Sequence, residues 1–198
     1  DTLIQDDIIN PLPELLISLD SDTGCIPFDI QVVNNSTIQS GSISEYRYNW
    51  GDGNSSVGSN PGFTYTSPGK YGVSIRGTSD KGCVDSVMLS DSVVVFDNPK
   101  ADFYYTPEDP STLKNVITLV DSSSKDAIDW IWTVSDGGSY SGSSAQHTFI
   151  DSGNYIVTLR IINNNGCFDE ETKIIYVNAD LFIHIPSGFS PNGDGIND

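Results

Sequence analysis

The sequence repeats itself with a fixed offset of 84 residues. The segment "YNWGDG" at 48–53 matches "WTVSDG" at 132–137, and "FTYTSPGKYGVSI" at 63–75 matches "HTFIDSGNYIVTL" at 147–159. Further along, "KGCVD" at 81–85 matches "NGCFD" at 165–169. Self-similarity at one spacing, without a gap, indicates tandem copies of one structural module. We therefore expect two similar domains in series.

The same comparison predicts the domain boundaries. "NP" recurs at 10–11 and 98–99, so we predict one domain over residues 10–97 and a second over residues 98–179. The offset aligns residues 1–4 with 85–88, which predicts that residues 1–9 are the last strand of a preceding repeat. Residues 180–198 are assigned to a separate C-terminal segment.

Each repeat consists of short apolar segments separated by turns rich in Gly, Pro, Asn, Asp and Ser, and no segment keeps a helical period. The predicted strands include 71–78 and 86–96, while the serine-rich 139–146 is expected to be a loop. Six or seven strands per repeat are typical of an immunoglobulin-like β-sandwich. The predicted fold class is all-β, with two such sandwiches in tandem and the start of a small C-terminal β-domain.

The charge and residue content argue against several functions. Nine Lys and Arg against 27 Asp and Glu give a net charge of −18, which repels nucleic acid and anionic membrane surfaces. No apolar run approaches the roughly 20 residues of a membrane span. Only two His residues are present, and no Cys or His spacing suggests zinc. We expect no enzymatic activity and no required cofactor.

The segment "YRYNWGDGNSSVGSNPGFTYTSPGKYGVSI" at 46–75 resembles the PKD (polycystic kidney disease) domain. The signature of that family is an aromatic-x-aromatic-Gly-Asp-Gly strand and turn, followed by N-P-x-x-x-Y and P-G-x-Y-x-V. Residues 10–97 match it closely. Residues 98–179 match it more loosely, with "WTVSDGG" in place of the usual turn. The resemblance implies two tandem PKD-type sandwiches.

The residues of this motif also have a physical interpretation. Tyr48 and Trp50 lie two positions apart, so both point to one face of a strand and can fill the centre of the sandwich. Gly51 and Gly53 permit the positive φ angles of a tight turn, in which Asp52 accepts backbone N–H bonds. The positions predicted to form the core and turn are Tyr48, Trp50, Asp52, Tyr71, Trp132, Asp136 and Tyr155.

Three cysteines allow one disulfide and one free thiol. Cys83 and Cys167 occupy equivalent positions in the two repeats, whereas the position equivalent to Cys25 is Asp109. We predict a disulfide between Cys25 and Cys83 and an unpaired thiol at Cys167.

The C-terminal "IPSGFSPNGDGIND" at 185–198 resembles the start of the type B C-terminal sorting domain of the type IX secretion system, as in gliding-motility-associated adhesins. The residues that match the family pattern are Ile185, Pro186, Phe189, Pro191, Asn192, Gly193, Asp194, Gly195, Asn197 and Asp198. The resemblance implies that this tail is recognised for export and attachment to the cell surface.

A calcium loop is the alternative interpretation of the same stretch. Ser190, Asn192 and Asp194, followed by Gly195, fit the first, third, fifth and sixth positions of an EF-type loop. Against calcium, Ser replaces the usual Asp at the first position, and no flanking helices are predicted.

These features suggest a non-catalytic C-terminal segment of a large secreted adhesin on the surface of an outer-membrane bacterium, with PKD repeats as a stalk. The implied partners are the type IX translocon or its shuttle, outer-membrane surface proteins and, through upstream regions, extracellular polysaccharide. The alternative is a set of accessory modules in a secreted polysaccharide hydrolase or protease whose catalytic domain lies upstream.

Overall fold

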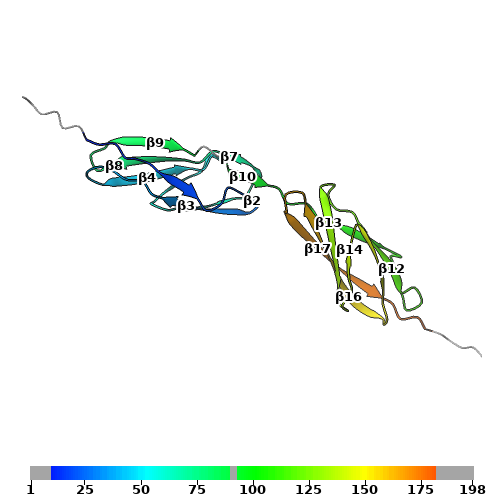
Figure 1. Cartoon of the computed structure of the whole chain (residues 1–198). Coiled ribbons are helices and arrows are strands. Elements are labelled where there is room, and N and C mark those ends of the chain that lie inside the picture. Colours follow the sequence, from blue (N-terminus) through cyan, green and yellow to red (C-terminus); the bar gives the residue numbers. More distant parts are fainter. Residues whose placement is uncertain (1–9, 90–92, 182–198) are drawn as a thin grey trace, which may run out of the picture. The chain divides into compact units, whose positions relative to one another are not determined.

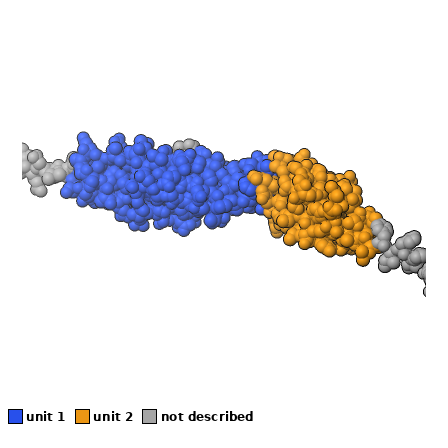
Figure 2. Space-filling view, turned by 90° about the horizontal axis from the view of Figure 1, so that it is seen from below, with its two compact units in different colours: residues 1–99, 162–169 blue, residues 100–161, 170–198 orange. Residues whose placement is uncertain are grey.

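The computed structural model describes residues 10–89 and 93–181. All regular elements in these residues are β-strands. Within these residues, no helix has the length and apolar character needed to span a membrane. The chain divides into two compact units (Figure 2). Unit 1 contains the residues up to Pro99 together with Ile162–Asp169; unit 2 contains Lys100–Ile161 and the residues from Glu170 on.

The described residues of unit 1 include ten complete strands in three sheets, ordered β1-β3-β6, β2-β10-β7 and β5-β4-β8-β9 (Figure 1). The strands are β1 (Ile17–Leu19), β2 (Thr23–Cys25), β3 (Phe28–Asn34), β4 (Ile43–Asn49), β5 (Ser55–Val57), β6 (Gly62–Tyr65), β7 (Gly69–Tyr71), β8 (Ser74–Ser79), β9 (Val84–Met88) and β10 (Val93–Phe96). Alternate residues point inward, as in β3, where Ile30 and Val32 are buried. Their apolar side chains join a core centred on Tyr48, Trp50 and Tyr65.

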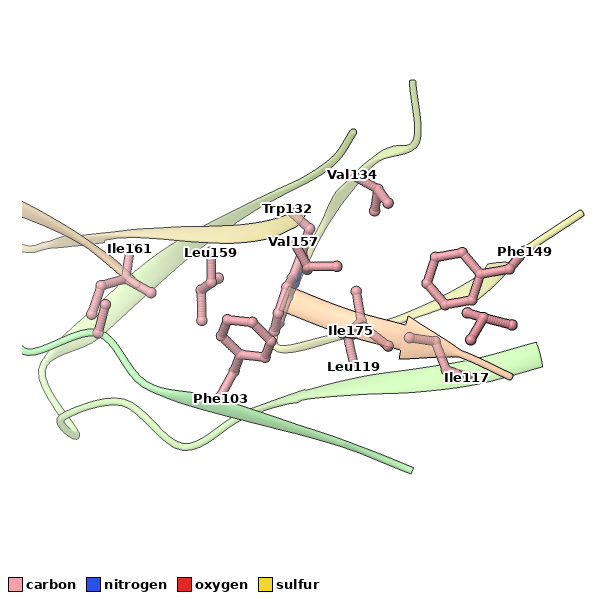
Figure 3. Close-up of a cluster of buried hydrophobic side chains, with 12 residues drawn as sticks. Phe103, Ile117, Leu119, Trp132, Val134, Phe149, Val157, Leu159, Ile161 and Ile175 are labelled. Atoms are coloured by element: carbon pink, nitrogen blue, oxygen red, sulfur yellow. The ribbon is translucent and has the colours of Figure 1, made fainter. Parts of the chain in front are cut away.

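Unit 2 is a sandwich of two sheets, ordered β11-β12-β15 and β14-β13-β16-β17. The strands are β11 (Phe103–Thr106), β12 (Val116–Asp121), β13 (Ala127–Val134), β14 (Ser139–Ser141), β15 (Ser144–Thr148), β16 (Gly153–Asn163) and β17 (Phe168–Val177). Trp132 is fully buried at the centre, with Phe103 edge-on to its ring at 5.2 Å between centroids (Figure 3). The predicted all-β class with two sandwiches is confirmed.

The two repeats differ where the sequence predicted one strand at 71–78. In the first repeat the chain changes sheets there: β7 pairs with β10, and β8 pairs with β4. Gly51 lies against Gly72, where a Cβ on Gly51 would come within 2.7 Å of the Gly72 nitrogen. In the second repeat Ser135 and Ile156 occupy these positions and exchange two hydrogen bonds of 2.9 and 3.1 Å. There β16 runs without interruption.

Three other strand predictions need correction. The predicted strand 86–96 is two strands in different sheets, because β9 pairs with β8 whereas β10 pairs with β2 and β7. The predicted loop 139–146 contains β14 and the first three residues of β15, 144–146. The short strand β2 was not predicted, since Thr-Gly-Cys shows no alternation. It pairs in parallel with β10, which brings Cys25 opposite Phe96.

Candidate functional site

The Gly-Asp-Gly turn of the first repeat follows β4. Gly51 and Gly53 have φ angles of +83° and +95°, a region that favours glycine. Asp52 accepts the backbone N–H of Asn54 at 3.0 Å and the Asn54 side-chain amide at 2.8 Å. The carboxylate of Asp52 is therefore bonded within its own turn, which is the structural role of an aspartate in such a loop.

Tyr48 and Trp50 lie on one face of the strand that leads into this turn, and both are fully buried. The Trp50 ring stacks on Tyr48 at 5.8 Å and on Phe63 at 4.8 Å between centroids. The Tyr48 hydroxyl donates to the carbonyl of Ser59 at 2.8 Å, and burial raises the pKa of Tyr48 to about 12. This cluster is the hydrophobic centre of unit 1.

The equivalent turn of the second repeat carries a different set of contacts. Asp136 accepts the backbone N–H of Gly138 at 3.3 Å, and its other oxygen lies 2.8 Å from Nε2 of His147. Nδ1 of His147 in turn lies 2.8 Å from the hydroxyl of Tyr140. The His147 side chain is buried, so this chain of hydrogen bonds satisfies both of its ring nitrogens.

An aspartate, a histidine and a hydroxyl linked by hydrogen bonds resemble the side chains of a catalytic triad. Comparison with the first repeat instead explains these three residues as part of the packing of the domain. There Phe63 occupies the position of His147, Ser56 that of Tyr140 and Trp50 that of Val134. The Trp50 ring nitrogen donates to Ser56 at 2.9 Å. The second repeat thus exchanges a tryptophan-centred packing arrangement for a polar network in the same place.

Tyr71 and Tyr155 form the same contact in the two repeats. The Tyr71 hydroxyl donates to the carbonyl of Ser67 at 2.9 Å, and the Tyr155 hydroxyl donates to that of Asp151 at 2.9 Å. A tyrosine that bonds back to the backbone a few residues upstream is the tyrosine corner of immunoglobulin-like sandwiches. These two residues therefore fix the loops that precede β7 and β16.

The cysteines are paired differently from the sequence prediction. Cys25 is bonded to Cys167, with 5.6 Å between their Cα atoms, and Cys83 is the free cysteine of the part of the chain that the structure describes. The predicted Cys25–Cys83 pair and the predicted free thiol at Cys167 are both wrong.

The physical reason lies in the placement of β2. Cys25 lies beside the last residue of β10, where the chain leaves the first repeat. Cys83 lies in the turn between β8 and β9, at the opposite end of unit 1 (Figure 1). A disulfide requires Cα atoms within about 7 Å. The turn that carries Cys167 belongs to unit 1 together with Cys25, and this pair meets the requirement.

Other predicted sites are not part of the described structure. The sorting-motif residues from Ile185 to Asp198 lie outside the described residues, and so do the calcium candidates Ser190, Asn192 and Asp194. Within residues 10–89 and 93–181, no group of three or more His, Cys, Asp or Glu side chains is arranged to hold a metal ion.

Comparison with known proteins agrees with this architecture. A sequence profile described as "PKD domain" matches residues 18–95 and again residues 97–179. Among solved structures, the PKD1 domain of Vibrio anguillarum Epp is 27% identical, with a TM-score of 0.39 over 44% of this chain and 100% of that one. The PKD1 domain of the Vibrio cholerae metalloprotease PrtV is 27% identical, with a TM-score of 0.37 over 43% of this chain and 99% of that one. The chain belongs to the PKD domain family and contains two PKD domains in tandem.

Proposed function

We propose that this chain is a non-catalytic stalk segment of a secreted cell-surface adhesin, exported through the type IX secretion system by its C-terminal tail. The observation that carries the stalk proposal is the Cys25–Cys167 disulfide, because it joins the two segments that match the PKD profile. A protein that transmits force between a surface and a distant ligand needs domains that resist extension. No chemistry at the domains is required for that task.

The disulfide supports a location outside the cytoplasm. Structural disulfides form and persist in oxidising compartments and are rare in the reducing cytosol of most organisms. The net charge of −18 fits an exposed surface that stays soluble and does not bind nucleic acid.

The disulfide also supports a mechanical role. A force applied to the two ends of the chain passes from Cys25 directly to Cys167 through the sulfur bridge. The residues between these cysteines, which include most of both PKD domains, are then spared extension. A stalk built in this way keeps its length under load even when the non-covalent contacts of a domain fail.

The tail supports the export proposal through its sequence alone. Ten residues between Ile185 and Asp198 match the type B sorting pattern. The partners that follow from this are the type IX translocon or its shuttle and a surface protein of the outer membrane.

Export can be tested in the bacterium that makes the protein. The full-length protein would be compared with a variant carrying Asn192→Ala, Gly193→Ala and Asp194→Ala, using protease accessibility on intact cells. We expect the wild type on the cell surface and the variant retained in the periplasm. The matched control, Asn34→Ala and Asn54→Ala in the first PKD domain, should reach the surface normally.

Equal surface exposure of the wild type and the tail variant would remove the sorting proposal. Calorimetric titration of the full-length protein with calcium then tests the alternative interpretation, that the tail binds calcium. Heat released by the wild type and lost in Asp194→Ala would assign the tail to calcium.

A further inference from the structure

The two PKD domains present their hairpin cysteines on turns of the same geometry. We call these turns the cysteine turns: Ser79–Cys83 in the first domain and Asn163–Cys167 in the second. In the first, the Ser79 N–H donates to the Cys83 carbonyl at 2.8 Å and the Gly82 N–H donates to the Ser79 carbonyl at 3.0 Å. The equivalent bonds in the second turn measure 2.9 and 3.0 Å.

The side-chain contacts of the two turns also correspond. The Cys83 N–H donates to Oγ of Ser79 at 3.0 Å, and the Cys167 N–H donates to Oδ1 of Asn163 at 3.1 Å. The glycines before the cysteines have φ angles of +79° and +78°. Each turn therefore holds its cysteine in the same backbone conformation, although only Cys167 is oxidised.

The second cysteine turn meets the first domain at its exit, where β10 ends. Cys25 is the residue opposite Phe96 in the β2–β10 pair, and Asn163 Nδ2 donates to the carbonyl of Asp97 at 3.3 Å. The Asn98 side chain donates to the carbonyl of Ile26 at 2.8 Å. Cys25, beside the last strand of the first domain, thus lies where it can bond to the cysteine turn of the domain that follows.

The first cysteine turn lies at the start of the first domain, near the residue at which the chain enters it. The sulfur of Cys83 lies 3.8 Å from the carbonyl of Asn10, the residue of the "NP" junction that begins the domain. Cys83 is partly exposed there, whereas Cys167 is fully buried in its disulfide.

We propose that Cys83 forms an inter-repeat disulfide. Its partner is a cysteine at the exit of a preceding PKD domain of the same kind. The observation that identifies the partner is the disulfide of Cys167, which lies on a turn of the same geometry and is bonded to Cys25. By analogy, the partner of Cys83 is the cysteine at the position of Cys25 in the preceding domain, at the end of a short strand that pairs with the last strand of that domain. The proposal rests on the stalk function proposed above, because it requires a preceding repeat.

Formation of this bond is a two-electron oxidation. The Cys83 thiolate attacks the disulfide of an extracytoplasmic thiol oxidoreductase, which releases one of its sulfurs as a thiolate and leaves a mixed disulfide. The thiolate of the preceding domain then attacks the Cys83 sulfur of that mixed disulfide. The oxidoreductase leaves as a dithiol, having gained the two electrons and, through solvent, the two protons that the cysteine thiols lost.

Disulfides placed in this way overlap along the chain. Cys25 precedes Cys83 in the same domain, so the loop closed by one inter-repeat disulfide begins before the previous loop ends. A pulling force would then pass between repeats through a sulfur bridge and cross each repeat between its Cys83 and its Cys25. The second domain carries Asp109 at the position of Cys25, so by this scheme it does not bond to the cysteine turn of a domain that follows it.

The test uses the whole chain lengthened by one repeat, with residues 10–97 duplicated in tandem so that Asp97 is followed by Asn10. This protein has five cysteines. Non-reducing digestion and mass spectrometry should link Cys83 of the second copy to Cys25 of the first copy, beside the Cys25–Cys167 bond of the original pair. Titration of the denatured, unreduced protein should then find one free thiol.

Three free thiols, with the Cys25–Cys167 bond present in the same molecules, would overturn the proposal. So would a Cys83 of the second copy that is bonded to another molecule. In the matched variant, Cys25→Ser in the first copy alone, the Cys83 of the second copy should become reactive to maleimide without reduction. A variant with Cys83→Ser in the first copy should keep both disulfides. These outcomes do not depend on export, so loss of the sorting proposal would leave this one standing.

Discussion

Cys25 and Cys167 are joined by a disulfide although 142 residues of sequence separate them. The bond connects the end of β2 in the first PKD domain to the turn between β16 and β17 in the second. The two domains are therefore connected twice, once through the chain between residues 95 and 97 and once through the disulfide.

Removal of the disulfide should destabilise the chain more than removal of the free thiol. In the chain-entropy model, a loop of this length contributes about 5 kcal/mol to the free energy of unfolding. We expect Cys167→Ser to lower the urea midpoint by an amount that corresponds to roughly 2–5 kcal/mol. Cys83→Ser is the control and should change stability by no more than about 0.5 kcal/mol. Equal losses in the two variants would contradict the assignment.

The disulfide should limit how far the chain extends under force. In single-molecule pulling between the termini, the oxidised chain should not release the residues between Cys25 and Cys167. Reduction with dithiothreitol should add the contour length of those 142 residues. At about 3.3–3.6 Å per residue this is roughly 480 Å, less the folded length. A full-length release before reduction would show that the bond is absent.

The aspartates of the two equivalent turns should differ in their contribution to stability. Asp52 bonds only to its neighbour Asn54 in the described contacts, whereas Asp136 also bonds to the buried ring of His147. Loss of the Asp136 carboxylate leaves a buried ring nitrogen without its partner, a cost of about 1–3 kcal/mol. We therefore expect Asp136→Ala to lower the free energy of unfolding of unit 2 by more than Asp52→Ala lowers that of unit 1.

Double-mutant analysis distinguishes this network from a general effect of the turn. The His147→Phe substitution places in the second domain the residue found at position 63 of the first. In that background, Asp136→Ala should cost no more than Asp52→Ala does. An unchanged cost would mean that the His147 contact contributes nothing.

Unit 1 should lose stability in alkaline solution between about pH 10 and pH 12. Burial raises the pKa of Tyr48 from 10.0 in the unfolded chain to about 12, so the folded state holds its proton more tightly. The stabilisation is complete below pH 10 and is lost as the pH rises through the folded pKa. Burial raises the pKa of Tyr65 as well, which adds to the same dependence.

Tyr48→Phe isolates the contribution of this hydroxyl. At neutral pH the variant loses the hydrogen bond to Ser59, at a cost of about 1 kcal/mol. Between pH 10 and pH 12 its stability should fall less steeply than that of the wild type, as measured by urea unfolding at each pH. Parallel curves would show that Tyr48 does not carry the dependence.

The sequence predicted the fold where local patterns repeat. Alternating apolar residues at Tyr155, Val157 and Leu159 indicated β16, and two copies of the pattern at one offset indicated two sandwiches. In β16, Val157 and Leu159 are fully buried as alternation requires. The network around His147 had a sequence signal too, because Phe63 and Ser56 change together to His147 and Tyr140 at the same offset.

Other features had no local signal. Where the chain changes sheets between β7 and β8, Gly72 lies against Gly51, a residue of the turn after β4 that is distant in the sequence. The strand β2 consists of Thr-Gly-Cys, which shows no alternation and is recognisable only through its pairing with β10.

By itself, then, the sequence determined the class of fold, the number of repeats and the equivalence of Cys83 and Cys167. Repetition and periodicity are properties of the chain, and they are visible without coordinates. Only the tertiary structure decided which of these two cysteines bonds to Cys25. A disulfide depends on the distance between Cα atoms, and that distance is set by the end of the sandwich at which each turn lies. Cys25 and Cys83 are separated by 58 positions, and the end of β2 and the turn between β8 and β9 lie at opposite ends of unit 1. Cys25 and Cys167 are separated by 142 positions, and the turn that carries Cys167 lies beside the end of β2.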